Sequence, residues 1–142
     1  MKSIPAFSRR GVGFTLLEMA VVLVLLGLGV PSLLRVVRNQ NDRMAAMAAR
    51  EAVAGLLHRA RQEALARGGA AVVLRVGPAE ATLVARGDTL ARAGVEETFG
   101  VHLSLARNRD ESILEYGPLG LGRISSQTLT FRRGRAETKL VV

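Results

Sequence analysis

The sequence predicts an α+β fold in which a long N-terminal helix packs on an antiparallel β-sheet head. Residues 14–34 carry a single charge, on Glu18, and are otherwise mostly apolar. Apolar residues then recur at helical spacing as far as Ala64. After Gly68 and Gly69 the chain changes to short runs with strand-like patterns. A long helix followed by a series of short strands is typical of the α+β class.

The segment 14–34 is long enough to cross a membrane. As a helix it would span about 31 Å at about 1.5 Å per residue, which matches the hydrocarbon core of a bilayer, about 30 Å thick. The stretch before it carries Lys2, Arg9 and Arg10 and no acidic residue. The positive-inside rule places such residues in the cytoplasm. We therefore expect one membrane span, with residues 35–142 on the opposite side.

The helical pattern continues beyond the span to Arg67. Pro31 interrupts the apolar segment, and a proline inside a helix tends to kink it. Further along, small and aliphatic residues recur every three or four positions and form one apolar stripe. The stripe consists of Ala45, Ala49, Ala52, Val53, Leu56, Ala60 and Ala64. Gly68 and Gly69 are expected to end the helix.

Six strands are expected after the helix. Their patterns are apolar or alternating, and turn signals such as Gly77-Pro78 separate them. The expected strands are 70–76, 79–85, 101–105, 113–116, 128–131 and 138–142. The first two should pair as a hairpin, and the sheet should cover the apolar stripe of the helix.

The start of the apolar segment resembles a known processing motif. Gly13-Phe14-Thr15-Leu16-Leu17-Glu18 follows a basic leader and opens an apolar run. It is similar to the processing site of type IV pilins and type II secretion pseudopilins. The resemblance implies that a prepilin peptidase cuts after Gly13 and N-methylates Phe14, and that Glu18 serves filament assembly. The domains would be a cleaved leader (1–13), a transmembrane segment (14–34) and a pilin-like head (35–142).

A different cut is disfavoured. An ordinary secretory signal is cleaved after its apolar region, which would place the cut after Gly29. Glu18 lies inside the apolar region and argues against this interpretation. A third interpretation, a single-span anchor protein with an accidental resemblance, is kept as an alternative.

The C-terminal half resembles the GspH/FimT group. Its glycine-rich turn at 117–122, Thr-Leu-Thr strand at 128–130, basic turn and final apolar strand occur in that order. This group contains H-type minor pseudopilins of type II secretion and their type IV pilus counterparts. The resemblance implies a single-pass inner-membrane subunit with a periplasmic head, which assembles with other pilins or pseudopilins. Many members carry a further Gly-Arg tail beyond the final strand. The sequence ends at Val142, so no function of that tail is assigned to it.

The basic turn supports an alternative function. Arg132, Arg133 and Arg135 flank Gly134, and the formal net charge of +8 favours acidic partners. Guanidinium groups in a turn can hold the phosphates of a nucleic acid. The alternative is therefore a DNA-binding minor pilin acting in natural transformation. The other interpretation of these arginines is an ordinary solvated turn.

The sequence contains no recognisable catalytic or metal-binding constellation. It has no cysteine, which excludes disulfides and thiolate metal sites. Neither His58 nor His102 has a second metal-ligating residue at suitable spacing, and Ser125-Ser126 lacks the glycines of a nucleophile elbow. We expect a structural protein rather than an enzyme, with no metal and no cofactor.

Overall fold

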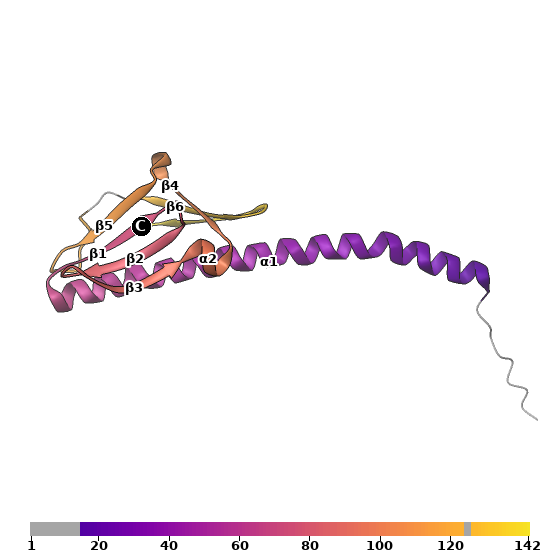
Figure 1. Cartoon of the computed structure of the whole chain (residues 1–142), viewed down its shortest axis with the longest axis horizontal. Coiled ribbons are helices and arrows are strands. Elements are labelled where there is room, and N and C mark those ends of the chain that lie inside the picture. The colour runs from indigo at the N-terminus through magenta and orange to yellow at the C-terminus, as the bar shows by residue number, and fades with distance from the viewer. Residues whose placement is uncertain (1–14, 124–125) are drawn as a thin grey trace, which may run out of the picture. The chain divides into compact units, whose positions relative to one another are not determined.

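The computed structural model describes residues 15–123 and 126–142. The chain divides into two compact units, 1–36 and 37–142. A single helix, α1 (Leu16–Arg67, 52 residues), contributes to both of them (Figure 1). It ends at Arg67, and the next residue, Gly68, has a φ of 82°, in the left-handed region that glycine adopts without strain. The predicted long helix and its glycine stop are confirmed.

In the first unit, every described side chain from Thr15 to Val36 is exposed. This part of α1 is the one described helix that is long and apolar enough to span a membrane. The helix continues through Pro31, which has no N–H to donate to the carbonyl one turn earlier. The Ser32 hydroxyl donates to the Leu28 carbonyl oxygen at 3.4 Å, within the same turn.

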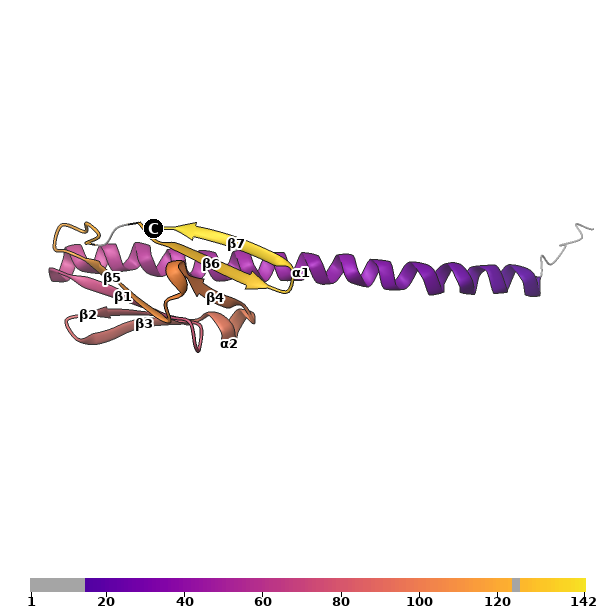
Figure 2. The ribbon, with the colours of Figure 1, turned by 90° about the horizontal axis from the view of Figure 1, so that it is seen from above.

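The second unit contains two antiparallel sheets. The described strands of the first sheet lie in the order β3-β2-β1-β5, and those of the second in the order β4-β6-β7 (Figures 1 and 2). The first sheet consists of β1 (Ala70–Arg75), β2 (Glu80–Ala85), β3 (Asp88–Gly94) and β5 (Glu111–Tyr116). The second consists of β4 (His102–Leu105), β6 (Thr128–Arg133) and β7 (Ala136–Val141). All six predicted strands are present, with small shifts at their ends.

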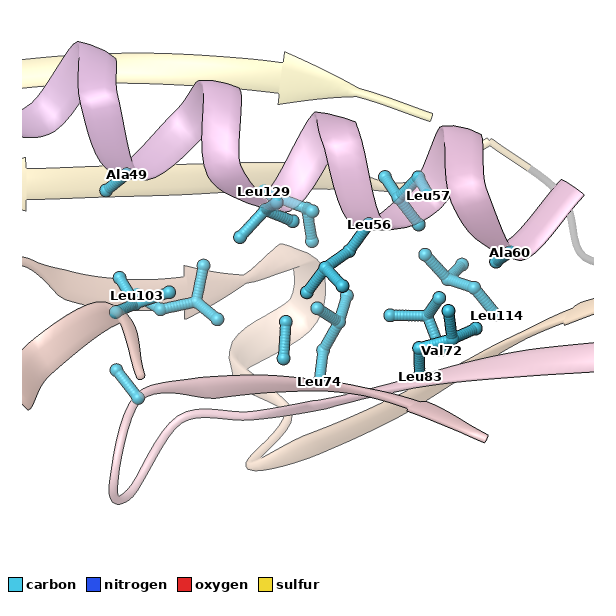
Figure 3. Packing of buried hydrophobic residues seen from close by; sticks show 14 of the residues in the cluster. Ala49, Leu56, Leu57, Ala60, Val72, Leu74, Leu83, Leu103, Leu114 and Leu129 are labelled. Carbon is cyan, nitrogen blue, oxygen red and sulfur yellow. The ribbon is translucent and has the colours of Figure 1, made fainter. Parts of the chain in front are cut away.

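The core lies between α1 and the two sheets. Figure 3 shows Ala49, Leu56 and Ala60 of α1 on the side that faces the leucines and Val72 of the strands. The buried residues of α1 are Ala46, Ala49, Val53, Leu56, Leu57, Ala60 and Ala64. Most of the predicted stripe is therefore buried. Ala45 and Ala52 are only half-buried, whereas Ala46 and Leu57 were not predicted and belong to the core.

The two sheets are joined by a buried polar contact. The Ser112 hydroxyl on β5 donates to the Gln127 side-chain oxygen, just before β6, at 2.6 Å. Gln127 also exchanges two backbone hydrogen bonds with Val142, both at 2.9 Å. A buried hydroxyl and amide must find partners inside the protein. This contact therefore ties the end of the last strand to the edge of the other sheet.

Three elements were not predicted, namely β3, the short helix α2 (Val95–Phe99) and the 3-10 helix η1 (Ala106–Asn108). The β3 sequence, Asp88 to Gly94, is small and charged rather than alternating, and its main partner is the backbone of β2. At the start of α2, the Ala79 carbonyl oxygen accepts hydrogen bonds from the N–H groups of Val95 (2.8 Å) and Glu96 (3.1 Å). The strand β3 and the helix α2 form on backbone partners earlier in the chain, in β2 and in the turn before it, which a pattern of side chains does not reveal.

The close packing of α1 on the sheets gives a stability prediction. Ala49 is fully buried, whereas its neighbour Ala48 is exposed. We expect Ala49→Leu to lower the free energy of unfolding by about 1–3 kcal/mol, because extra methyl groups must displace packed strands. Ala48→Leu should change it by no more than about 0.5 kcal/mol. Thermal unfolding of the full-length variants in detergent measures both, and equal stability of the two would contradict this packing.

Candidate functional site

The predicted processing site lies at the edge of what the structure describes. Gly13 and Phe14 lie outside the described residues, so their predicted roles remain predictions. Glu18 is described, in the first turn of α1, and its side chain is exposed. Its predicted role in assembly also remains a prediction.

Thr15 immediately precedes the first residue of α1 and contacts Glu18 directly. The backbone N–H of Glu18 donates to the Thr15 hydroxyl oxygen at 3.2 Å, and the N–H of Met19 donates to the Thr15 carbonyl oxygen at 3.1 Å. Thr15 is therefore the N-cap residue. The order Thr15-Leu16-Leu17-Glu18 matches a capping box, in which the glutamate can return a hydrogen bond to the N-cap backbone. Sequence reasoning missed this role, although the Thr-x-x-Glu spacing is its ordinary signal.

The three predicted arginines lie on one hairpin, with Arg132 and Arg133 at the end of β6 and Arg135 in the turn, but their surroundings differ. Arg133 Nε lies 3.2 Å from Asp42 Oδ1 on α1. A second nitrogen of the same guanidinium, Nη1, donates to the Phe99 carbonyl oxygen at 2.7 Å. Arg133 therefore joins the β6–β7 hairpin to both α1 and α2. The side chains of Arg132 and Arg135 are exposed.

Gly134 allows this hairpin to approach the helix. Its φ of 55° favours glycine, and a Cβ at this position would lie 2.5 Å from Asp42 Oδ2. A side chain here would displace the Asp42 carboxylate or the turn, and either movement would disturb the ion pair. Asp42 was not predicted to take part, because no sequence spacing connects it with Arg133.

The arrangement leaves two exposed cations at the turn. In the described chain, neither Arg132 nor Arg135 forms an ion pair with a carboxylate. In the β4–β6–β7 sheet, Arg132 lies opposite Glu137 on one side and His102 on the other. A phosphate would therefore meet Arg132 and Arg135, and it would meet Arg133 only if the pair with Asp42 opened.

The histidines have ordinary surface environments. The His58 Nε2 lies within hydrogen-bond distance of the Gln62 side-chain amide, at 3.2 Å. His102 Nδ1 lies 3.6 Å from a carboxylate oxygen of Glu96. Across residues 15–123 and 126–142, no three side chains of the metal-binding kinds come together.

Comparison with known proteins gives one informative similarity. No protein family model and no curated protein sequence matches this chain. The chain is similar to the crystal structure of the type IV minor pilin FimU from Pseudomonas aeruginosa, with a TM-score of 0.51 and 15% sequence identity. The similarity covers 74% of this chain and 83% of the FimU chain. At this identity the similarity concerns the fold. The long apolar helix and the antiparallel head therefore form a pilin-like fold.

Proposed function

We propose that this chain is a minor pilin or minor pseudopilin of the GspH/FimT type. It would be a structural subunit, not an enzyme, of a type IV pilus or a type II secretion pseudopilus. One observation carries the proposal: a pilin-like fold whose long helix begins with an exposed apolar segment. The motif Gly13-Phe14-Thr15-Leu16-Leu17-Glu18 stands at the start of that segment, where a pilin is processed.

The proposed mechanism is assembly from the inner membrane. The apolar half of α1 would rest in lipid after insertion, with the head in the periplasm, and would then leave lipid for a bundle of similar helices. Its exposed side chains are mainly Leu and Val, which suit both environments. Packing in either case requires no polar partner except for Glu18.

The two kinds of filament differ in their genetic neighbourhood. A secretin, a secretion ATPase and other pseudopilins beside this gene would support a secretion role. Pilus retraction and competence genes would support a type IV pilus. The fold is shared by both classes, so it does not favour either.

The first functional prediction concerns processing. We expect the mature protein to begin with N-methylated Phe14, because the peptidase of this family requires the preceding glycine. Mass spectrometry of the native protein measures the N-terminus. Gly13→Leu should leave full-length protein in the membrane, whereas Gly11→Leu should be processed normally. A mature N-terminus at Met1 or Val30 would rule the proposal out.

The second functional prediction concerns the carboxylate of Glu18. A charge within the apolar part of a membrane helix costs roughly 2.5–3.5 kcal/mol on insertion scales, and such residues usually have a partner. The new amine of Phe14 is the nearest fixed positive charge, either in the same subunit or in an adjoining one. Pairing between subunits would draw each new subunit to one axial register.

Two substitutions separate this pairing from helix capping. Glutamine serves in a capping box as glutamate does, but it has no charge for an amine. We expect both Glu18→Gln and Glu18→Val to be cleaved and inserted, and neither to restore filament assembly in a deletion strain. Glu51→Val, at an exposed position further along α1, is the control. Full complementation by Glu18→Gln would instead assign Glu18 to capping, and a mild defect in both variants would assign it to pairing within the subunit.

DNA binding is the second candidate function, and exposed Arg132 and Arg135 favour it. We expect the Arg132→Glu/Arg135→Glu double variant to lose retardation of duplex DNA by the full-length protein in detergent. Binding by the unmodified protein should weaken steeply as salt rises. Arg133 is left unchanged, since reversing its charge would break the contact with Asp42.

The control for this experiment is a second exposed pair of arginines. Arg107 and Arg109 lie on the connection between β4 and β5 and are exposed, so Arg107→Glu/Arg109→Glu makes the same change in net charge. If both double variants lost DNA retardation equally, the binding would depend on overall charge and not on the turn. No retardation by the unmodified protein at low salt would remove the DNA hypothesis.

A further inference from the structure

The loop between β5 and β6 carries two exposed leucines that are not part of the hydrophobic core. Leu119 is 75% exposed and Leu121 is 61% exposed. Beside them on α1, Leu65 is 58% exposed. Large apolar groups that gather on a surface usually mark an interaction site.

Backbone hydrogen bonds within the loop hold the segment that carries Leu119 and Leu121. The N–H of Gly120 donates to the Gly117 carbonyl oxygen at 2.8 Å, and the N–H of Gly117 donates to the Leu121 carbonyl oxygen at 2.9 Å. Gly120 has a φ of 67°, and a Cβ there would lie 3.1 Å from Leu65 Cγ and 3.2 Å from Arg61 Cγ. The loop therefore rests directly on the last turns of α1. A partner would meet a surface that is already formed.

Two hollows flank this loop, and Tyr116 lines both of them. The first, of about 360 Å³, is also lined by Leu57, His58, Arg61 and the loop residues Gly120 to Gly122. The second, of about 440 Å³, lies around the end of α1, with Pro118 and Arg123 in its wall. Apolar side chains of a bound segment could enter on both sides of the loop.

The rim of these hollows is positively charged. The arginines that line them are Arg61, Arg67, Arg86 and Arg123, and the single carboxylate in either lining is Glu115. Arg67 pairs with Glu63 at 2.7 Å. Within the described residues, Arg61 and Arg123 have no carboxylate partner.

The tyrosine between the hollows does not offset this charge. Burial raises the pKa of the Tyr116 hydroxyl above its ordinary value, and the positive charge of Arg61 partly opposes the rise. Tyr116 is therefore neutral at physiological pH, and the rim keeps its positive excess.

We propose that this end of the head is a docking surface for an acidic, apolar segment of a partner protein. The surface, here named the leucine–arginine surface, consists of Leu65, Leu119 and Leu121 with Arg61 and Arg123. The exposed leucines offer apolar contact beside the two hollows, of which Leu121 lines one, and the arginines of the linings can pair with carboxylates. A nucleic acid would use the arginines but would leave the leucines in water. The proposal does not depend on which filament the chain joins, because it concerns residues of the head alone.

The test uses full-length protein in lipid nanodiscs and three fluorescent peptides of equal length. In the first peptide leucine alternates with glutamate, in the second leucine alternates with lysine, and in the third serine alternates with glutamate. We expect the leucine–glutamate peptide to bind at least about tenfold more tightly than the other two, because only it matches both parts of the surface. Fluorescence anisotropy measures the affinities.

Two double variants of the surface, with a third double variant as control, locate the binding site. Leu119→Ser/Leu121→Ser and Arg61→Gln/Arg123→Gln should each weaken binding of the leucine–glutamate peptide about tenfold. Val141→Ser/Arg109→Gln, at exposed positions elsewhere on the head, should bind as the unmodified protein does. Circular dichroism confirms that each variant is folded.

Several outcomes would overturn the proposal. Equal binding of the leucine–lysine peptide, or an effect of the control variant as large as that of the surface variants, would remove the acidic partner. Binding of an oligonucleotide without binding of the leucine–glutamate peptide would assign the arginines to nucleic acid. Concentration-dependent dimerisation that Leu119→Ser/Leu121→Ser abolishes, with no peptide binding, would assign the surface to a second copy of this chain.

Discussion

The small-residue face of α1 is buried against two separate sheets, and the rest of the head depends on this contact. Ala49, Val53, Ala60 and Ala64 are fully buried in the core that α1 forms with the strands. Apolar burial of this kind is the main favourable contribution to folding. Residues of both sheets enter the same hydrophobic core, and the hydrogen bond between Ser112 and Gln127 links them directly. The helix therefore serves as the common surface on which both sheets are placed.

The last hairpin is attached to this helix by charge as well as by packing. Arg133 bonds to Asp42 on α1 and to the end of α2, while Phe131 of the same strand is fully buried. A partly buried guanidinium with a carboxylate and a carbonyl as acceptors satisfies several of its donors. A residue that looked like one of three equivalent surface arginines is thus a structural contact. The two arginines beside it, Arg132 and Arg135, remain exposed.

One helix meets two different demands along its length. Near its start, leucine and valine side chains are exposed on all sides, which suits lipid or a bundle of like helices. Further along, alanines gather on one face and charged residues occupy the others, which suits a head surrounded by water. Glu18 and its capping partner Thr15 stand at the start of the apolar part, where a carboxylate has few partners other than a helix end or an amine. The leucine–arginine surface belongs to the head, where the loop 117–122 packs on the last turns of α1.

The sequence by itself determined the long helix, its glycine stop, six of the strands and the α+β class. These features depend on periodicity, on glycine conformation and on the apolar run, all of which act locally. The tertiary structure decided the division into two sheets, the presence of β3 and α2, and the role of Arg133. Each of these depends on a partner distant in the chain: Asp42 is far from Arg133, Ser112 from Gln127, and Ala79 from Val95. Such pairs have no fixed spacing in the sequence, because they form only when folding brings separate elements together.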